Sequence, residues 1–260
     1  MQFANISILK DFLDEQVIRY NCPAFIEDDP IVIPHAYTNP LDIEIAAFFA
    51  STLAWGKRKI IINKGKQLLN MMDNAPYDFI MNHQEKDLEP FLYFKHRTFN
   101  TVDTLYFISF LKHHYQKHPT LETAFIINLS PNAPTIEIGL MHFHHLFFSL
   151  PNAPTRTRKH VATPARNAAC KRINMFLRWM VRKDNKGVDF GLWQRIKPHQ
   201  LVCPCDVHVA RVSRKLGLIQ RKNTDWQAAL ELTKNLKLLS AEDPIKYDFA
   251  LFGLGRYASF

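Results

Sequence analysis

The sequence contains little cysteine or glycine and has no long hydrophobic run. Its 260 residues include 8 glycines and 4 cysteines, which are widely spaced: Cys22, Cys170, Cys203 and Cys205. Four scattered cysteines are too few for a disulfide framework in a chain of this length. No apolar run approaches the roughly 20 residues that a membrane-spanning helix needs. The first ten residues also lack the pattern of a signal peptide, so we expect a soluble, cytoplasmic protein with no membrane partner.

Alternation of apolar and polar residues, the pattern of a half-buried strand, is also missing. Hydrophobic residues make up 47% of the chain and recur mainly at helical spacing. Helices are predicted over residues 6–21, 41–72, 102–115, 135–150, 164–183 and 224–238. We therefore expect an all-α fold of about ten helices.

Acidic residues are scarce in the second part of the chain. Residues 1–150 hold 12 Lys and Arg against 16 Asp and Glu, whereas residues 151–260 hold 21 against 8. The net charge of +9 therefore comes entirely from the second part. Such a segregated excess favours a nucleic-acid partner. We predict an acidic helical subdomain over 1–150 and a basic one over 151–260, with the proline-containing basic segment 151–164 as the linker.

The most informative stretch runs from Cys203 to Lys215. Asp206 lies where a helix N-cap belongs, because Val209, Val212 and Leu216 follow at helical spacing and Gly217 can end the helix. A basic stripe at positions i, i+3 and i+7 of this helix consists of His208, Arg211 and Lys215. A carboxylate beside cations can be a cap alone or the acid–base group of an enzyme that acts on a polyanion.

The predicted helix over 164–183 carries a second candidate group. Its predicted buried apolar face includes Ala169, Ile173, Phe176, Leu177 and Met180, and the residues on the opposite face are Lys171, Met175, Arg178 and Arg182. A basic helix face is commonly solvated. Neighbouring cations and burial nevertheless lower the pKa of a lysine, and a neutral lysine is a nucleophile.

The run Asn167-Ala-Ala169-Cys-Lys171-x4-Phe176-Leu-Arg resembles the hairpin and following helix of helix-hairpin-helix DNA glycosylases. It is most similar to the bacterial and archaeal 8-oxoguanine glycosylase/lyases, whose pattern is Gly-x-Gly-x-Lys-x4-Phe-Leu-Arg. Asp206-Val-His208-Val is similar to the Asp-x-His element that follows in the same superfamily. The likeness covers residues 163–217 and, more weakly, 41–72. The chain resembles an uncharacterised bacterial family at the edge of that superfamily.

This resemblance implies a helix-hairpin-helix glycosylase-like fold, with two helical subdomains around a cleft. Residues 41–72 would contribute to its core, 163–183 would form the hairpin-like element, and 206–217 would form the helix that carries the aspartate. The implied function is a DNA glycosylase and AP lyase that acts as a monomer on double-stranded DNA with a damaged base, for example an oxidised one, without a cofactor. Lys171 corresponds to the lysine that forms a Schiff base, and Asp206 to the catalytic aspartate.

The remaining site predictions concern DNA contacts. They are Lys57, Arg58, Arg156, Arg158, Lys159, Asn167, Arg172, His208, Arg211 and Lys215. Trp55 is either a wedge that fills the gap left by a flipped base or a core residue. Asn167 and Ala169 replace the two hairpin glycines of the glycosylase pattern, which weakens the expected backbone grip on a phosphate.

Two other function classes stay open. The replaced glycines favour a non-catalytic nucleic-acid-binding protein on the same fold. A metal-dependent hydrolase would use Asp206, His208 and the two nearby cysteines. The spacing Cys203-x-Cys205-x2-His208 is tighter than that of structural zinc sites and has no second pair, so we expect no metal. Residues 184–199 are predicted to be an insertion, either at the mouth of the site or inert.

Overall fold

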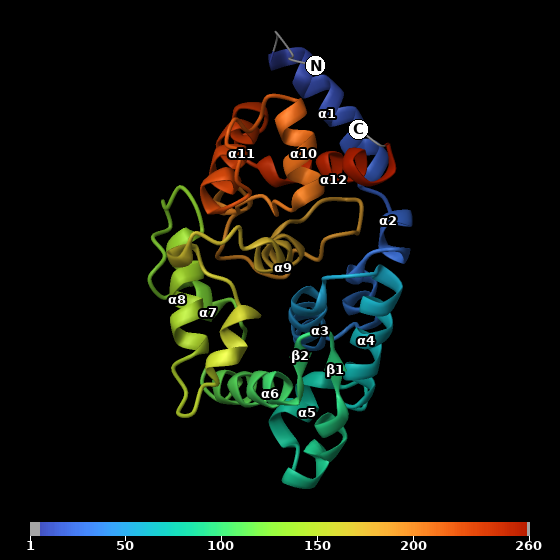
Figure 1. Cartoon of the computed structure of the whole chain (residues 1–260), viewed down its shortest axis with the longest axis vertical. Coiled ribbons are helices and arrows are strands. Elements are labelled where there is room, and N and C mark those ends of the chain that lie inside the picture. Colours follow the sequence, from blue (N-terminus) through green and yellow to red (C-terminus); the bar gives the residue numbers. More distant parts are fainter. Residues whose placement is uncertain (1–5, 259–260) are drawn as a thin grey trace.

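The computed structural model describes residues 6–258, which are mostly helical (Figure 1). The only strands among these residues are β1 (Lys95–His96) and β2 (Phe99–Asn100), which pair antiparallel. The predicted all-α class is therefore confirmed, and the helix-hairpin-helix arrangement stays a prediction. Within the described part of the chain, no helix is both long enough and apolar enough to cross a membrane.

Residues 6–258 contain both α-helices and 3-10 helices. The α-helices are α1 (Ile6–Tyr20), α2 (Ala24–Glu27), α3 (Pro40–Leu53), α4 (Arg58–Asn70), α5 (Pro76–Asn82), α6 (Thr101–Tyr115), α7 (Thr123–Ile126), α8 (Glu137–Phe147), α9 (Lys171–Val181), α10 (Val207–Lys215), α11 (Trp226–Leu239) and α12 (Tyr247–Tyr257). The 3-10 helices are η1 (Pro30–Val32), η2 (Pro34–Ala36), η3 (Glu85–Tyr93), η4 (Thr155–Lys159), η5 (Pro164–Arg166), η6 (Pro198–Gln200) and η7 (Pro244–Lys246).

Short polar side chains set the starts of several helices, because they satisfy the free backbone N–H groups there. Asn39 caps α3, and Pro40 follows at the first helical position. Asn100 caps α6 in the same way. Asp225 caps α11, so this helix begins at Trp226, slightly later than the predicted range 224–238.

The predicted helix over 164–183 begins later than expected. Pro164–Arg166 forms η5, and α9 starts only at Lys171. Between them, Asn167 and Cys170 adopt left-handed backbone conformations, with φ of 53° and 52°. A left-handed residue interrupts a right-handed helix. Lys171 is therefore the first residue of α9 rather than a residue two turns inside a longer helix.

A tight turn at Gly56 separates α3 from α4, so the predicted helical run over 41–72 restarts there. Gly56 has a φ of +110°, and a Cβ at this position would lie 2.7 Å from a guanidinium nitrogen of Arg97. The positive φ favours glycine here, whereas the flexible Arg97 side chain could move away from a Cβ. The turn leaves Trp55 and Lys57 side by side at the start of α4.

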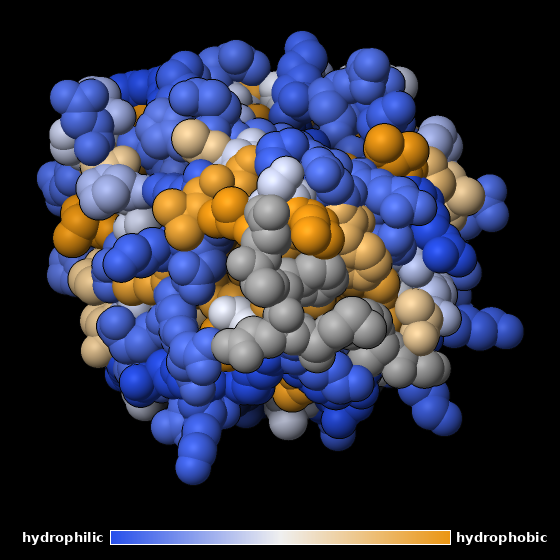
Figure 2. All heavy atoms as spheres, turned by 90° about the horizontal axis from the view of Figure 1, so that it is seen from above, coloured by the Kyte–Doolittle hydropathy of each residue, from blue (hydrophilic) through white to orange (hydrophobic). Residues whose placement is uncertain are grey.

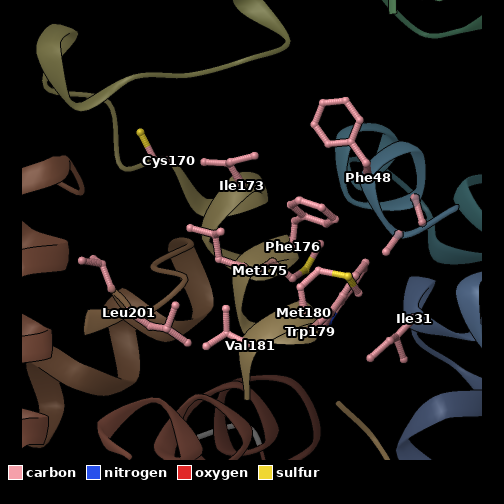
Figure 3. Packing of buried hydrophobic residues seen from close by; sticks show 14 of the residues in the cluster. Ile31, Phe48, Cys170, Ile173, Met175, Phe176, Trp179, Met180, Val181 and Leu201 are labelled. Carbon is pink, nitrogen blue, oxygen red and sulfur yellow. The ribbon is translucent and has the colours of Figure 1, made fainter. Parts of the chain in front are cut away.

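Side chains of α9 fill the centre of the hydrophobic core (Figure 3). As predicted, Ile173, Phe176, Leu177 and Met180 are all buried. Figure 3 shows Phe176 beside Phe48 of α3, and the two ring centroids lie 5.4 Å apart. This packing holds α9 in the middle of the molecule, with α3 on one side of it (Figure 1).

The N-terminal and C-terminal helices pack together. The ring of Tyr20 on α1 stacks on Tyr257 of α12 at 5.9 Å, and Asp14 lies 2.7 Å from the Lys246 ammonium of η7. Figure 2 looks down on this end of the molecule, where a mostly polar surface contains a smaller hydrophobic area. The division at residue 150 stays a prediction, and the structure adds that α1 lies with the basic C-terminal helices.

The proline-containing segment 151–164 is bound to α6 rather than free. Asp103 on α6 is fully buried, and three side chains from the segment contact its carboxylate. Arg156 forms an ion pair with it, the Thr157 hydroxyl donates a hydrogen bond at 2.8 Å, and His160 Nε2 lies 3.3 Å away. The segment is therefore anchored to α6, because a buried carboxylate needs these partners, and its role as the linker stays a prediction.

Replacing Asp103 with asparagine is expected to lower the free energy of unfolding by about 3 kcal/mol near neutral pH, because it breaks a buried ion pair. Burial raises the pKa of Asp103, but hydrogen bonds from His160, the Asn100 backbone and Thr157 outweigh it and hold the pKa at about 2. A lowered pKa adds stability above the pKa of the unfolded chain, and that stability is lost as the pH falls toward 2. Urea unfolding should therefore show a smaller wild-type advantage at about pH 3 than at about pH 7. An equal difference at both pH values would contradict this role.

Candidate functional site

Asp206 is the N-cap of α10, as predicted. Its Oδ1 atom accepts hydrogen bonds from the backbone N–H groups of His208 at 2.9 Å and Val209 at 3.0 Å. Gly217 follows the helix with a φ of +75°, which matches its predicted place after the last turn. The cap bonds occupy one carboxylate oxygen and fix the direction of the other, Oδ2.

Lys171 faces that second oxygen from the start of α9. Lys171 Nζ lies 3.9 Å from Asp206 Oδ2, and the two side chains are 26% and 22% exposed. The ammonium also lies 3.5 Å from Met175 Sδ, one turn further along α9. A separation of 3.9 Å is longer than a hydrogen bond. The structure thus brings the two predicted catalytic groups together in a solvent-accessible ion pair.

Both side chains line a cavity of about 820 Å³. Its walls come from α2, η1, the α3–α4 turn, α9, the start of α10, and α12. Its charged lining residues are Asp29, Lys57, Arg58, Lys59, Lys171, Arg172, Arg178, Asp206, Asp248 and Arg256. Cations thus outnumber carboxylates in this lining by about two to one, and an anionic ligand suits that balance.

Trp55 forms part of the cavity wall. Its ring lies 5.0 Å from His96 and 5.7 Å from His160, and the Arg172 guanidinium lies 4.8 Å from the ring centroid. Arg172 in turn donates hydrogen bonds to the carbonyl oxygens of Thr52 and Lys159. Burial lowers the pKa of Arg172 to about 10. Trp55 is therefore half-buried and held in place by contacts with these three side chains, and the wedge role stays a prediction.

The predicted basic face of α9 is mostly buried rather than solvated. Arg178 and Arg182 are each only 3% exposed and lie among carboxylates. Arg178 pairs with Asp189 at 3.2 Å and with Asp248, and Arg182 pairs with Asp189 at 3.1 Å. The helix pattern identified the arginines but not these partners, which come from other parts of the chain. Asp248, which lines the cavity, is the main site residue that the sequence did not reveal.

The predicted DNA contacts fall into two groups. Those that line the cavity are Lys57, Arg58, Arg172 and His208, and those that do not are Arg156, Arg158, Lys159, Asn167, Arg211 and Lys215. In the first group, Arg58 also donates a hydrogen bond to the Tyr257 hydroxyl at 3.0 Å.

Several residues of the second group have structural contacts. Arg158 lies 4.8 Å from the Phe148 ring centroid, and Arg211 donates a hydrogen bond to the Gly255 carbonyl at 2.8 Å. Asn167 donates to Asp225 at 3.2 Å, which ties the turn before α9 to the start of α11. A role in DNA binding stays a prediction for all of them.

The predicted insertion packs against the core instead of the cavity. Within 184–199, the Phe190 N–H donates to the Trp179 carbonyl at 2.9 Å, and the Trp193 indole donates to buried Glu44. No residue from 184–199 lines the cavity. The alternative that placed this segment at the mouth of the site is therefore wrong.

The cysteines beside Asp206 are buried and free. Neither Cys203 nor Cys205 lines the cavity, and burial raises the pKa of Cys205 to about 12. Across residues 6–258, no three His, Cys, Asp or Glu side chains are grouped so that they could hold a metal ion.

A comparison with protein-family models matches residues 29–257 to a family described as "Protein of unknown function (DUF2400)". Searches of curated proteins and of solved structures each found no match. The matched range includes both groups of the ion pair and every residue that lines the cavity except Phe25 of α2. The chain therefore belongs to the DUF2400 family.

Proposed function

We propose that the protein is a DNA base-excision enzyme, a glycosylase with AP lyase activity, whose nucleophile is Lys171 and whose catalytic carboxylate is Asp206. The observation that carries the proposal is the approach of Lys171 Nζ to within 3.9 Å of Asp206 Oδ2 on the wall of one cationic cavity. Neither group is fully buried, so a substrate can reach both.

The chemistry needs these two groups. The lone pair of a neutral Lys171 amine attacks C1′ of a flipped nucleotide, and the bond from C1′ to the base breaks with its electrons leaving on the base. Positive charge develops on the sugar, and the Asp206 carboxylate stabilises it. The bond between C1′ and the ring oxygen O4′ then breaks as a proton passes from Nζ to O4′, and a protonated Schiff base forms between Nζ and C1′. Loss of a C2′ proton from this Schiff base breaks the C3′–O bond and expels the 3′-phosphate. Sodium borohydride reduces this Schiff base to a stable amine, which links the protein to the DNA.

The size and rigidity of the site support this reaction. A cavity of about 820 Å³ lies within the usual range of small-molecule sites, so it has room for a flipped base and its sugar. The two cap bonds hold Asp206 before substrate arrives, and a preoriented carboxylate needs little reorganisation as charge develops.

Cations at the cavity support contacts with the DNA backbone. Lys57 and Lys59 are exposed at the start of α4 and line the cavity beside Arg256. Flipping a nucleotide distorts the duplex, and lysine and arginine side chains hold the distorted backbone through its phosphates.

Reversing both lysine charges, in the double variant Lys57→Glu with Lys59→Glu, is expected to weaken binding to lesion-bearing duplex DNA by about tenfold or more at low salt. The slope of log affinity against log salt should become shallower by about two, one for each lost phosphate contact. The matched control is Lys86→Glu with Lys234→Glu, which makes the same charge change at exposed lysines outside the cavity. Equal losses in the two variants would show that only net charge matters.

The proposed function is tested by borohydride trapping. Wild-type protein is incubated with duplexes that contain 8-oxoguanine, uracil, an alkylated base or an abasic site, and covalent complexes are separated by gel electrophoresis. We expect a cross-link with the abasic duplex and with at least one damaged base. A protein that traps none of the four duplexes would not be a glycosylase/lyase for these lesions.

One observation favours the alternative, a non-catalytic nucleic-acid-binding protein. The turn that precedes α9 contains Asn167 and Ala169 where the glycosylase pattern has glycine, and its backbone is tied to α11 through Asn167 and Trp226. This alternative predicts salt-dependent DNA binding that survives Asp206→Asn, with no trapped complex on any duplex.

A further inference from the structure

A second carboxylate, that of Asp248, lies in the wall of the same cavity. Asp248 is the second residue of α12 and is only 4% exposed, yet it lines the cavity together with Lys171 and Asp206. Its Oδ2 accepts a hydrogen bond from Arg178, and its Oδ1 lies 4.0 Å from the Cys203 thiol. A buried carboxylate with only one strong hydrogen-bond partner is costly to maintain. A ligand or a neighbouring proton donor can complete its hydrogen bonding.

Lys171 and Asp248 line the same cavity from two helices, α9 and α12. Lys171, Met175 and Arg178 follow one another at i, i+4 and i+7, so they share a face of α9, and all three line the cavity. Lys171 Nζ lies 3.5 Å from Met175 Sδ, and the charge of Lys171 lowers the pKa of Asp248, so the ammonium acts on that carboxylate. Arg178 holds the Asp248 carboxylate at the far end of this row.

The proposed reaction leaves one proton unassigned. A lysine ammonium has no lone pair, so Nζ must lose a proton before it can attack C1′. Asp206 is committed to the helix cap through Oδ1, and in the proposed reaction its charge stabilises the sugar cation. We propose that Asp248, positioned by Arg178, accepts this proton from Lys171, directly or through one water molecule. The inference rests on the proposed function and assigns separate tasks to the two carboxylates.

The step balances without a further reactant. One N–H bond of the ammonium breaks and one O–H bond forms on Asp248, so a charged pair becomes a neutral pair. The amine lone pair then forms the bond to C1′ while the bond to the base breaks. Bound DNA excludes water from the cavity, and a drier site favours the neutral pair over the charged one.

The electrostatics of Asp248 fit a group that gains and loses a proton near neutral pH. Burial raises the pKa of Asp248 to about 6, although Arg178 and Lys171 act in the opposite direction. The other groups that face it are Asp206, whose charge raises the pKa further, and the Cys203 thiol. General bases work best when their pKa lies near the operating pH.

The test is the pH dependence of single-turnover trapping on the abasic duplex and on a damaged-base duplex that the wild type traps. For the wild type, we expect the rate to fall on the acid side with a midpoint near pH 6. Asp248→Asn should react about 100-fold more slowly near neutral pH, which is the usual range for losing a general base. Its rate should recover at alkaline pH, where hydroxide removes the lysine proton instead.

The matched control is Asp189→Asn. Asp189 is also buried and also pairs with Arg178, but it does not line the cavity. Its substitution disturbs the same arginine, so any general effect on folding appears in both variants, whereas the acid midpoint near pH 6 should remain. His208→Gln is a second control, because His208 also lines the cavity and histidine is the residue that most often acts as a general base.

The outcomes are distinguishable. If the wild type traps DNA but its trapping rate does not fall as the pH decreases from about 7 to about 5, the role of Asp248 is contradicted, even if the Asp248→Asn variant does not fold. A folded Asp248→Asn variant with the wild-type rate and profile contradicts it as well. If the trapping rate of His208→Gln no longer falls at acid pH, the group that accepts the proton from Lys171 would be His208 instead of Asp248. A wild type that traps no duplex overturns the proposed function, and this inference with it.

Discussion

Substitution of Lys171 by alanine is expected to reduce borohydride trapping to background, a loss of about 1,000-fold or more, because no other group supplies the covalent bond to C1′. Lys171→Arg should lose trapping to the same extent. An arginine keeps the positive charge but stays protonated, so it cannot act as the nucleophile. The measurement is single-turnover trapping on the abasic duplex, on which no base needs to be released.

The two variants also separate chemistry from binding and folding. A partly exposed ion pair such as the one between Lys171 and Asp206 contributes about 1 kcal/mol or less to stability. Both variants should therefore unfold close to the wild-type temperature. Lys171→Arg should also bind lesion-bearing DNA as tightly as the wild type does. Trapping by Lys171→Ala at the wild-type rate would move the nucleophile to another lysine.

The second large effect concerns Asp206, whose two roles can be separated by two substitutions. Asparagine is as good an N-cap as aspartate, so Asp206→Asn should keep α10 intact while removing the charge. Alanine removes both, and Asp206→Ala should also lose about 1 kcal/mol in the free energy of unfolding. Urea unfolding of the two variants measures the cap alone.

Activity should respond differently from stability. We expect Asp206→Asn to release a damaged base about 100- to 1,000-fold more slowly, because the charge that opposes the developing sugar cation is gone. On an abasic duplex the base is already absent, so trapping by the same variant should be reduced far less. A variant that releases the base at the wild-type rate would leave Asp206 as a helix cap only.

Local patterns in the sequence were sufficient for most of the helices. Apolar spacing predicted α6, and apolar spacing together with a short polar cap placed Asp206 at the start of α10. These features depend on residues a few positions apart, so a single sequence carries them. The buried apolar face of α9 follows from the same periodicity.

The missed features depend on residues that are distant in the chain. Arg178 and Asp248 are separated by 70 positions in the chain. Because they pair, the face of α9 that the sequence pattern predicted to be basic is buried. Asn167 and Cys170 adopt left-handed conformations that glycine would have signalled, and they shift the start of α9 to Lys171. Charge asymmetry indicated a basic half, but only folding decides that Lys57 and Arg58 from the acidic half join the cavity.

The most direct measurement is to locate the covalent bond itself. Wild-type protein is trapped on the abasic duplex with borohydride, digested with protease and nuclease, and the modified peptide is sequenced by mass spectrometry. We expect the reduced sugar on Nζ of Lys171, in a peptide that continues into α9. An adduct on another residue, such as Lys57 or Lys59, or a digest with no adduct at all, would contradict Lys171 as the nucleophile.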